Sequence, residues 1–317
     1  MCIRDRIDTL RQIQGAYSLV ILTNKKLIGV RDPFGIRPLV LGDKNGSPVL
    51  ASETCALDMI GAKYVRDIEN GEIVVITESG MESIKPFKKI AERPCIFERI
   101  YFASPDSIVG NKTVYTYRKA LGEQLAIENN IIADVIVPIP DSGVSAAIGF
   151  SQKSKIPFEL GIIRSHYVGR TFIEPSQTIR QFGVKLKHSV NRSCIENKKV
   201  ILIDDSIVRG TTASKIVKMV YEAGAKEVHL GISCPPILHP DFYGIDTPNY
   251  NQLIAYKSSI KEMTEIVGAN SLFFLSLNGT YKAMGCEKRD SNTPQFTDHC
   301  FTGEYPIDVT EILKLNR

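Results

Sequence analysis

A run of thirteen residues in the second half of the chain, Val200–Thr212, combines groups that suit phosphate chemistry. An apolar stretch comes first, two adjacent carboxylates (Asp204 and Asp205) follow it, and Arg-Gly-Thr-Thr then opens a helical pattern. Glycine lets the backbone approach a ligand closely, and the free N–H groups of a helix N-terminus favour a phosphate. The run therefore predicts a phosphate cradle beside carboxylates suited to ribose hydroxyls or to phosphate-bound Mg²⁺.

A solvated turn between a strand and a helix is the structural alternative, and for a lone Asp-Asp pair it would be the better interpretation. The whole run fits a phosphate site more closely than a plain turn, although it is not a Walker A loop, because no Gly-Lys-Ser/Thr follows. A second polar turn, Asp141-Ser142-Gly143, follows another apolar run. By itself this second turn would be interpreted as an ordinary one.

Strand and helix patterns alternate after about residue 100. Apolar residues spaced by three and four predict a helix over 114–129, and further helices are expected over 144–151 and 211–223. Short apolar runs predict strands over 133–139, 158–163, 199–203 and 228–233. This alternation predicts a parallel sheet with helices on both faces, whose carboxyl edge is where ligands bind.

The first hundred residues have the pattern of a β-rich domain with little helix. One short helix is expected near 54–60, and a hairpin turn at 24–26. The expected strands are 16–22, 27–30, 39–41, 49–51 and 72–77.

The composition is that of an ordinary globular protein. With 317 residues, 43% hydrophobic and 23% charged, the chain is long enough for two domains. A net charge of +4 is too small to indicate a nucleic-acid partner, and no apolar stretch approaches the roughly 20 residues that cross a bilayer. The seven cysteines contain no CxxC pair and are odd in number, which favours a reducing, cytoplasmic location.

The Val200–Thr212 run resembles the phosphoribosyl diphosphate (PRPP) signature of type I phosphoribosyltransferases. Tyr167–Pro175 resembles the catalytic loop of one branch, the amidophosphoribosyltransferases. Other segments similar to that family are Tyr101–Ser107, Ser233–Ile237, Phe242–Asp246 and Phe301–Pro306. The resemblance implies an α/β type I phosphoribosyltransferase fold over 96–317, preceded over 1–95 by part of a β-rich class II (Ntn-type) glutamine amidotransferase domain.

The resemblance also implies roles for the residues that match the family's motifs. Asp204 and Asp205 would hold the ribose hydroxyls and the Mg²⁺–PRPP complex, with Ser142 near the metal. Other substrate-binding positions would be Asp141, Gly143, Ser206, Val208, Arg209, Gly210, Thr211 and Thr212. A catalytic loop carrying Arg170, Thr171 and Phe172 would close over PRPP, stabilise the departing pyrophosphate and exclude water.

The family's reaction implies the partners. Glutamine is hydrolysed in one domain, and ammonia attacks PRPP in the other to give 5-phosphoribosylamine, the first committed step of purine synthesis. Purine nucleotides commonly inhibit the family, and we expect a homo-oligomer. Arg164-Ser165-His166 stands where the family often has Lys-Asn-Arg, so we expect altered loop and inhibitor contacts.

Gly15–Ser18, Arg31–Leu39 and Ala51–Thr54 resemble the later part of a class II glutamine amidotransferase domain. Pro33 and Gly35 mark a tight turn, while Arg31 and Arg37 suit a structural role equally well. That domain's nucleophile is an N-terminal cysteine followed by Gly-Ile, whereas this chain begins Met-Cys-Ile-Arg. We therefore expect the glutaminase half to be truncated at its N-terminus and its nucleophile to be absent.

Some family members hold a [4Fe–4S] cluster through four cysteines. Cys95 and Cys300 match two of those positions, whereas Asp241 stands at the third and Thr297 lies near the fourth. Two thiolates cannot hold such a cluster, so we expect none. The isolated histidines are given no role, apart from a possible contact by His166.

Three alternatives remain open at this point. A salvage phosphoribosyltransferase for orotate or a purine base would keep the fold, but such enzymes carry no amidotransferase segment. A regulator that only senses PRPP would carry a DNA-binding helix-turn-helix, and no such pattern is evident. A folded but inactive PRPP-binding fragment is the third alternative.

We predict that this chain releases no glutamate from glutamine and depends on free ammonia. The expectation follows from the absent cysteine nucleophile. Glutamate formation measured against a heat-killed control checks it, and release above that control would contradict it.

Overall fold

The computed structural model describes residues 3–165, 188–247 and 249–311. The chain forms two compact units. The first unit comprises Met1–Tyr115, Leu238–Tyr250 and Arg289–Arg317, and the second comprises Thr116–Ile237 and Asn251–Lys288. The domain boundary expected after residue 95 falls inside the first unit and stays a prediction.

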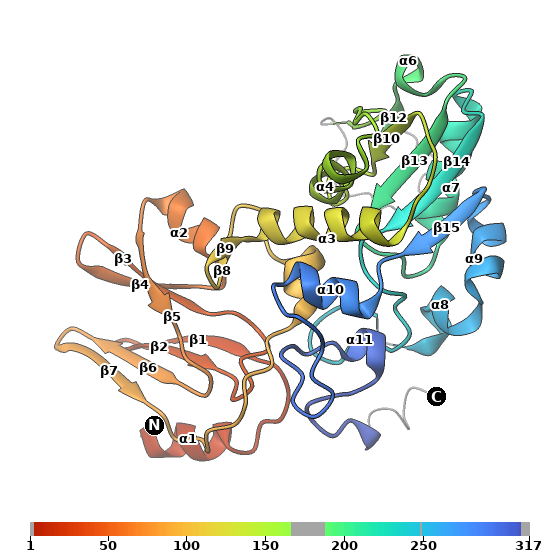
Figure 1. Ribbon diagram of the computed structural model, residues 1–317. Helices are drawn as coiled ribbons and strands as arrows, with labels where there is room; N and C mark the ends of the chain where they lie inside the picture. Colours follow the sequence, from red (N-terminus) through yellow and green to blue (C-terminus); the bar gives the residue numbers. More distant parts are fainter. Residues whose placement is uncertain (1–2, 166–187, 248, 312–317) are drawn as a thin grey trace, which may run out of the picture. The chain divides into compact units, whose positions relative to one another are not determined.

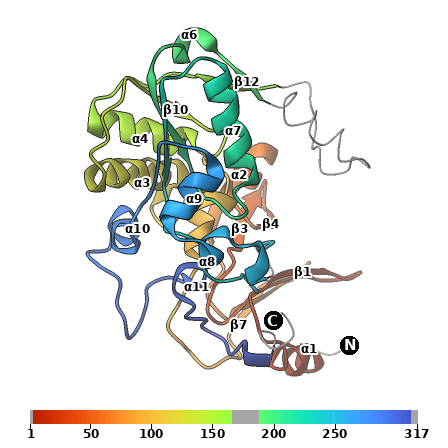
Figure 2. The same cartoon turned by 90° about the vertical axis from the view of Figure 1, so that its right-hand side faces the viewer.

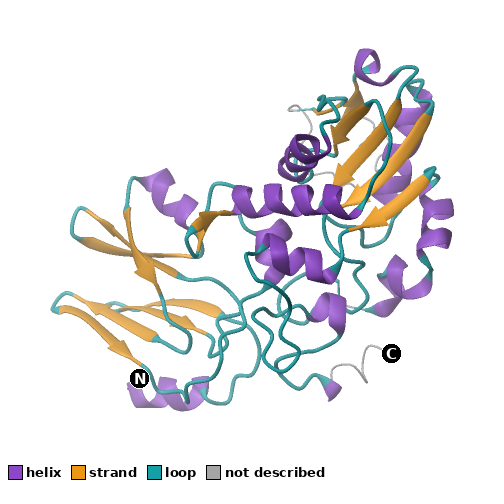
Figure 3. Cartoon of the chain, in the orientation of Figure 1, coloured by secondary structure: helices purple, strands orange, loops and turns teal. Residues whose placement is uncertain are grey.

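The first unit is built on two antiparallel sheets, which Figure 3 shows in orange. One sheet has the order β1 (Ser18–Leu22), β2 (Leu27–Arg31), β6 (Ile73–Thr77) and β7 (Gly80–Ile84). The other has the order β4 (Ser47–Ala51), β3 (Val40–Lys44) and β5 (Lys63–Asp67). The β-rich pattern and the hairpin between the first two strands are confirmed.

Strand β6 carries the core of this unit because both of its faces are buried. Ile73 and Val75 join one apolar cluster, with Val30 of β2 and Leu10 of helix α1 (Ile3–Leu10). Val74 and Ile76 point the other way into a second cluster. Side chains alternate between the faces of a strand, so the unbroken apolar sequence of β6 is what a doubly covered central strand requires.

The second unit contains a parallel sheet with the order β10 (Val135–Pro138), β13 (Lys199–Asp204), β14 (Glu227–Ile232) and β15 (Ser271–Phe274). Helices α3 (Val114–Glu128) and α4 (Val144–Ser154) lie on one face (Figures 1 and 2). Helices α7 (Thr211–Glu222) and α9 (Ile260–Val267) lie on the other. The expected parallel sheet with helices on both faces is confirmed.

The strand expected over 158–163 is wrong in extent. Only Phe158 bridges to Ile136 of β10, and the chain then turns away into β11 (Ile162–Arg164), which pairs antiparallel with β12 (His188–Val190). The break lies at Gly161, whose N–H donates back to the Glu159 carbonyl. A Cβ at Gly161 would lie 2.7 Å from the Val137 side chain, so the close approach to β10 requires glycine.

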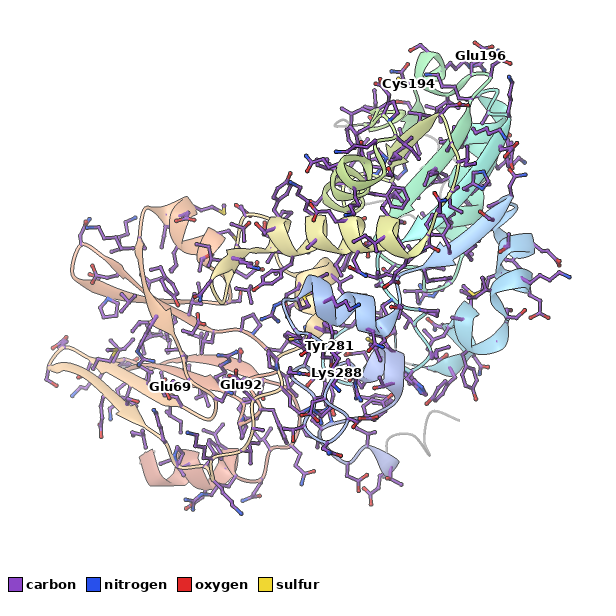
Figure 4. All side chains as sticks on the ribbon, in the orientation of Figure 1. Glu69, Glu92, Cys194, Glu196, Tyr281 and Lys288 are labelled. Carbon is purple, nitrogen blue, oxygen red and sulfur yellow. The ribbon has the colours of Figure 1, made fainter. Side chains whose placement is uncertain are left out.

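The remaining described elements are short. They are α2 (Thr54–Ile60), η1 (Glu98–Phe102), β8 (Ile108–Val109), β9 (Lys112–Thr113), α6 (Arg192–Ile195), η3 (Tyr250–Gln252), α8 (Ile254–Lys257), α10 (Leu277–Ala283) and α11 (His299–Thr302). Tyr281 of α10, labelled in Figure 4, is fully buried. No helix in the described ranges is long and apolar enough to span a bilayer.

Helices α3 and α4 touch backbone to backbone through two glycines. A Cβ at Gly122 of α3 would lie 1.8 Å from the carbonyl oxygen of Ala146 in α4. A Cβ at Gly149 of α4 would lie 1.9 Å from the carbonyl oxygen of Lys119 in α3. Since α4 begins at Val144, directly after Asp141-Ser142-Gly143, this contact also fixes where that polar turn lies.

We predict that Gly122→Ala destabilises the second unit by about 1–3 kcal/mol, because the new methyl group has no space. In an exposed helix the same change would stabilise by about 1 kcal/mol, so the sign of the effect tests the packing. Urea unfolding measures it, with Ile127→Ala on the same helix as control, since Ile127 is 57% exposed. A variant as stable as the wild type would contradict the close contact.

Candidate functional site

Asp204 and Asp205 lie at the carboxyl end of β13, where a fully buried strand meets the surface. Val200, Ile201, Leu202 and Ile203 are each 0% exposed. The Ser142 hydroxyl donates to Asp204 Oδ1 at 3.2 Å. The structure thus brings the two polar turns of the sequence together at one edge of the parallel sheet, as expected from the position of ligand sites in such folds.

Gly143 makes this approach possible. A Cβ at residue 143 would lie 2.2 Å from the Ile203 carbonyl oxygen, at the end of β13. The Gly143 N–H donates to the Ile139 carbonyl at 2.9 Å, and the Ile139 N–H donates to Ile203 at 2.8 Å. The turn is therefore held directly against the strand that carries the carboxylates.

The two carboxylates compete electrostatically. Burial raises the pKa of Asp204 well above its ordinary value, and the neighbouring charge of Asp205 raises it further. The N–H of Asp205 and the hydroxyl of Ser142 donate to Asp204 and oppose that rise only in part. The Ser206 hydroxyl donates to Asp205, so the pair has few donors and would be stabilised by a cation.

This donor set suits Mg²⁺. Mg²⁺ usually takes one or two protein carboxylates and completes its shell with water and substrate phosphate. Asp204, Asp205 and the Ser142 hydroxyl supply hard oxygen donors of that kind. Among the described residues no group of three or more His, Cys, Asp or Glu side chains is arranged to hold an ion.

The turn from Ser206 to Thr212 leads into helix α7 and exposes a row of backbone donors. For none of the eight N–H groups from Ser206 to Ala213 does the described part of the chain provide an acceptor. Gly210 has a φ of 75°, which is the left-handed region that glycine enters without strain. Consecutive free N–H groups at a helix N-terminus form an anion site, and this arrangement agrees with the expected cradle.

Asp141 differs from its neighbours in the same turn. Its carboxylate forms an ion pair with Arg164 of β11, and both side chains are largely exposed. The carboxylate is therefore directed to β11, while Ser142 faces Asp204. The sequence marks Arg164 as a departure from the family's pattern but gives no sign of its pairing with Asp141.

Arg170, Thr171 and Phe172, and also His166, lie within residues 166–187, outside the described residues. Strands β11 and β12 flank that segment and pair from Ile162 with Val190 to Arg164 with His188.

The Arg-Asp-Pro-Phe-Gly-Ile-Arg motif of the first unit is a structural turn. The Arg31 guanidinium donates to the carbonyls of Gly35, Arg37 and Ile68 at 2.8–3.1 Å. Fully buried Asp32 accepts N–H bonds from Phe34 and Ile36. Arg37 pairs with Glu98 at 2.6 Å, so both arginines have structural contacts and the tight turn is confirmed.

Asp241, at one position matched to a cluster ligand, has a partner that the sequence missed. His299 was given no role, yet its Nε2 lies 2.8 Å from Asp241 Oδ2, and both side chains are buried. Tyr243 and Ile245 also donate N–H bonds to Asp241, and these donors lower its pKa despite burial. The backbones of Cys95 and Thr297 form an isolated β-bridge. The expectation of no iron–sulfur cluster stays a prediction.

We predict that Asp204→Asn stabilises the metal-free protein while it removes a ligand-binding group. A carboxyl whose pKa is raised by folding loses stability as the pH rises above its unfolded value, so the variant gains most at high pH. The free energy of unfolding at pH 8 in EDTA should rise by about 1 kcal/mol or more, since each pKa unit corresponds to about 1.4 kcal/mol.

The gain should shrink as the pH is lowered, because the wild-type carboxyl, whose pKa is raised, takes up its proton. Asp134→Asn is the matched control, because Asp134 accepts the Lys199 N–H at the opposite end of β13 and an asparagine keeps an acceptor oxygen. A destabilised Asp204→Asn, or a gain that does not depend on pH, would contradict the electrostatic account.

Comparison with known proteins agrees with this geometry. A glutamine amidotransferase domain model matches residues 3–59, and a phosphoribosyl transferase domain model matches residues 119–241. The amidophosphoribosyltransferase of Rhizobium etli is 58% identical over 311 residues, which is 96% of this chain and 63% of that protein. That of Bacillus subtilis is 47% identical over 97% of this chain and 64% of its own length, so the chain spans about three fifths of these relatives.

Solved structures show the same relationship. The glutamine PRPP amidotransferase from B. subtilis, complexed with ADP and GMP, has a TM-score of 0.90 and 46% identity, covering 98% of this chain and 68% of that one. A structure described as the allosteric regulatory enzyme of purine biosynthesis has a TM-score of 0.91 and 45% identity, covering 100% and 68%. At this identity and coverage, the chain belongs to the amidophosphoribosyltransferase family.

Proposed function

We propose that this chain transfers an amino group from ammonia to PRPP, giving 5-phosphoribosylamine and pyrophosphate, the first committed step of purine synthesis. The observation that carries the proposal is the pairing of the Asp204–Asp205 carboxylates with a row of free N–H groups at one sheet edge. A ribose with a phosphate on C5 and a pyrophosphate on C1 matches both features. Relatives at 47–58% identity named amidophosphoribosyltransferase support it.

In the proposed reaction, the nitrogen lone pair of ammonia forms a bond to C1 of the ribose while the bond from C1 to the pyrophosphate oxygen breaks. The nitrogen then loses a proton to solvent. The N–H groups of Ser206–Ala213 would hold the 5-phosphate, and Asp204 and Asp205 would orient the ribose hydroxyls. Bound Mg²⁺, held by these carboxylates and near Ser142, would offset negative charge on the departing pyrophosphate.

In the whole protein, we propose that glutamine supplies the ammonia and is released as glutamate. The family-model match to a glutamine amidotransferase domain over residues 3–59 supports this source. We further propose that purine nucleotides inhibit the protein, since the similar B. subtilis structure is complexed with ADP and GMP.

A cytoplasmic location is supported by the cysteines. None of the six cysteines in the described ranges forms a disulfide, as expected in a reducing compartment. The homo-oligomeric state stays a prediction.

The experiment that tests the function is ammonia-dependent release of pyrophosphate from PRPP in the presence of Mg²⁺. We expect activity in the wild type and a loss of about 100-fold or more in Asp204→Asn, which removes a charge used to hold the metal and ribose. Asp134→Asn should keep wild-type activity. Equal inactivity of wild type and Asp204→Asn, with PRPP still bound, would instead favour a non-catalytic PRPP-binding fragment or sensor.

A further inference from the structure

The turn from Ser206 to Thr212, here called the phosphate turn, is contacted by a segment more than forty residues further along the chain. Three consecutive residues of the turn each contact Gln252 or Ile254. The Ile254 N–H donates to the Val208 carbonyl at 2.9 Å. The Arg209 guanidinium donates to Gln252 Oε1 through Nε at 3.0 Å and also through Nη2.

Gly210 completes the contact. A Cβ at this position would lie 2.8 Å from Ile254 Cδ1, so the turn lies directly against the Ile254 side chain. Residues 208–210 are those immediately before helix α7. Their conformation therefore decides how the N–H groups at the start of the helix are presented to a ligand.

The bracing segment is itself anchored in the unit. Leu253 is 0% exposed and Ile254 is 8% exposed. Helix α8, which begins at Ile254, packs on α9, and α9 packs on both α7 and β15. A contact made by Gln252 is consequently tied to the same layer of helices that carries the phosphate turn.

Arg209 has little else to hold it. Its side chain is exposed, and Gln252 is the one hydrogen-bond partner that the described residues provide. A long exposed side chain without a fixed partner samples many rotamers, and immobilising it costs entropy when a ligand binds. Gln252 removes that freedom before the ligand arrives.

We propose that Gln252 is a positioning residue for the 5-phosphate of the substrate. It does not touch the ligand; it fixes Arg209 and, with Ile254, the shape of the turn whose N–H groups receive the phosphate. The inference rests on the proposed function, because it takes a ribose 5-phosphate as the occupant of the turn.

The test is calorimetric binding of two probes to the full chain in the presence of Mg²⁺. Ribose 5-phosphate carries the group that Gln252 would serve, and pyrophosphate does not. Gln252→Ala should weaken ribose 5-phosphate binding by about fivefold to tenfold, the equivalent of one typical hydrogen bond, and leave pyrophosphate binding within twofold. Gln252→Glu keeps an acceptor oxygen and should restore ribose 5-phosphate binding.

Two controls separate positioning from a general loss of structure. Asn251→Ala alters the exposed neighbour on the same turn and should change neither affinity. Arg209→Ala removes the same contact from its other side, so adding Gln252→Ala to it should cause no further loss. Should Gln252→Ala alone fold poorly, Arg209→Ala with Gln252 intact still tests the contact, because it should weaken ribose 5-phosphate binding and leave pyrophosphate binding within twofold.

The inference is overturned if Gln252→Ala binds ribose 5-phosphate as the wild type does, if both probes weaken equally, or if the losses of the two variants multiply. A wild type that binds neither ribose 5-phosphate nor PRPP would overturn the proposed function together with this inference. Normal wild-type binding with an unaffected Gln252→Ala would overturn the inference alone.

Discussion

The burial of two adjacent carboxylates at the end of β13 is the constraint on which the second unit depends. Two like charges cannot both leave water cheaply, and the raised pKa of Asp204 records that cost. The nearby chain limits the cost through the Ser142 hydroxyl. Ser142 reaches Asp204 because Gly143 lies against β13, and α4 behind it packs on α3 through Gly122 and Gly149. The close backbone packing of α3, α4 and β13 therefore determines which hydrogen-bond donor reaches the Asp204 carboxylate.

A second buried carboxylate in the chain shows what a structural solution looks like. Asp241 accepts two backbone N–H bonds and a bond from His299, and its pKa falls below the ordinary value. Asp204 is half-buried, yet its neighbours include another carboxylate and few donors, and its pKa rises. Asp241 therefore finds enough hydrogen-bond donors within the fold, whereas Asp204 does not and would be stabilised by a bound cation. Perturbed groups of the second kind mark functional sites.

The sequence predicted what is encoded locally. The apolar runs identify α2, α3, α4 and α7 to within a few residues, and the thirteen-residue run located the polar turn between β13 and α7. The strand expected over 158–163 failed because Gly161 must pass close to Val137, a tertiary contact. His299 and Gln252 were missed for the same reason. Their partners, Asp241 and Arg209, lie 58 and 43 residues away, and nothing in the intervening sequence indicates the pairing.

Two kinds of group in the site lack a partner of opposite charge, and they lie next to each other in the chain. The carboxylates need positive charge, and the N–H groups of residues 206–213 need an acceptor. A single metal-bound phosphate ester would supply both the positive charge and the acceptor oxygens, so its binding would satisfy groups that the fold leaves without partners. A ligand that binds only the folded state stabilises it in proportion to its excess over its dissociation constant. The free protein is therefore less stable than it would be without these groups, because the polar groups that weaken it are the ones proposed to hold the substrate.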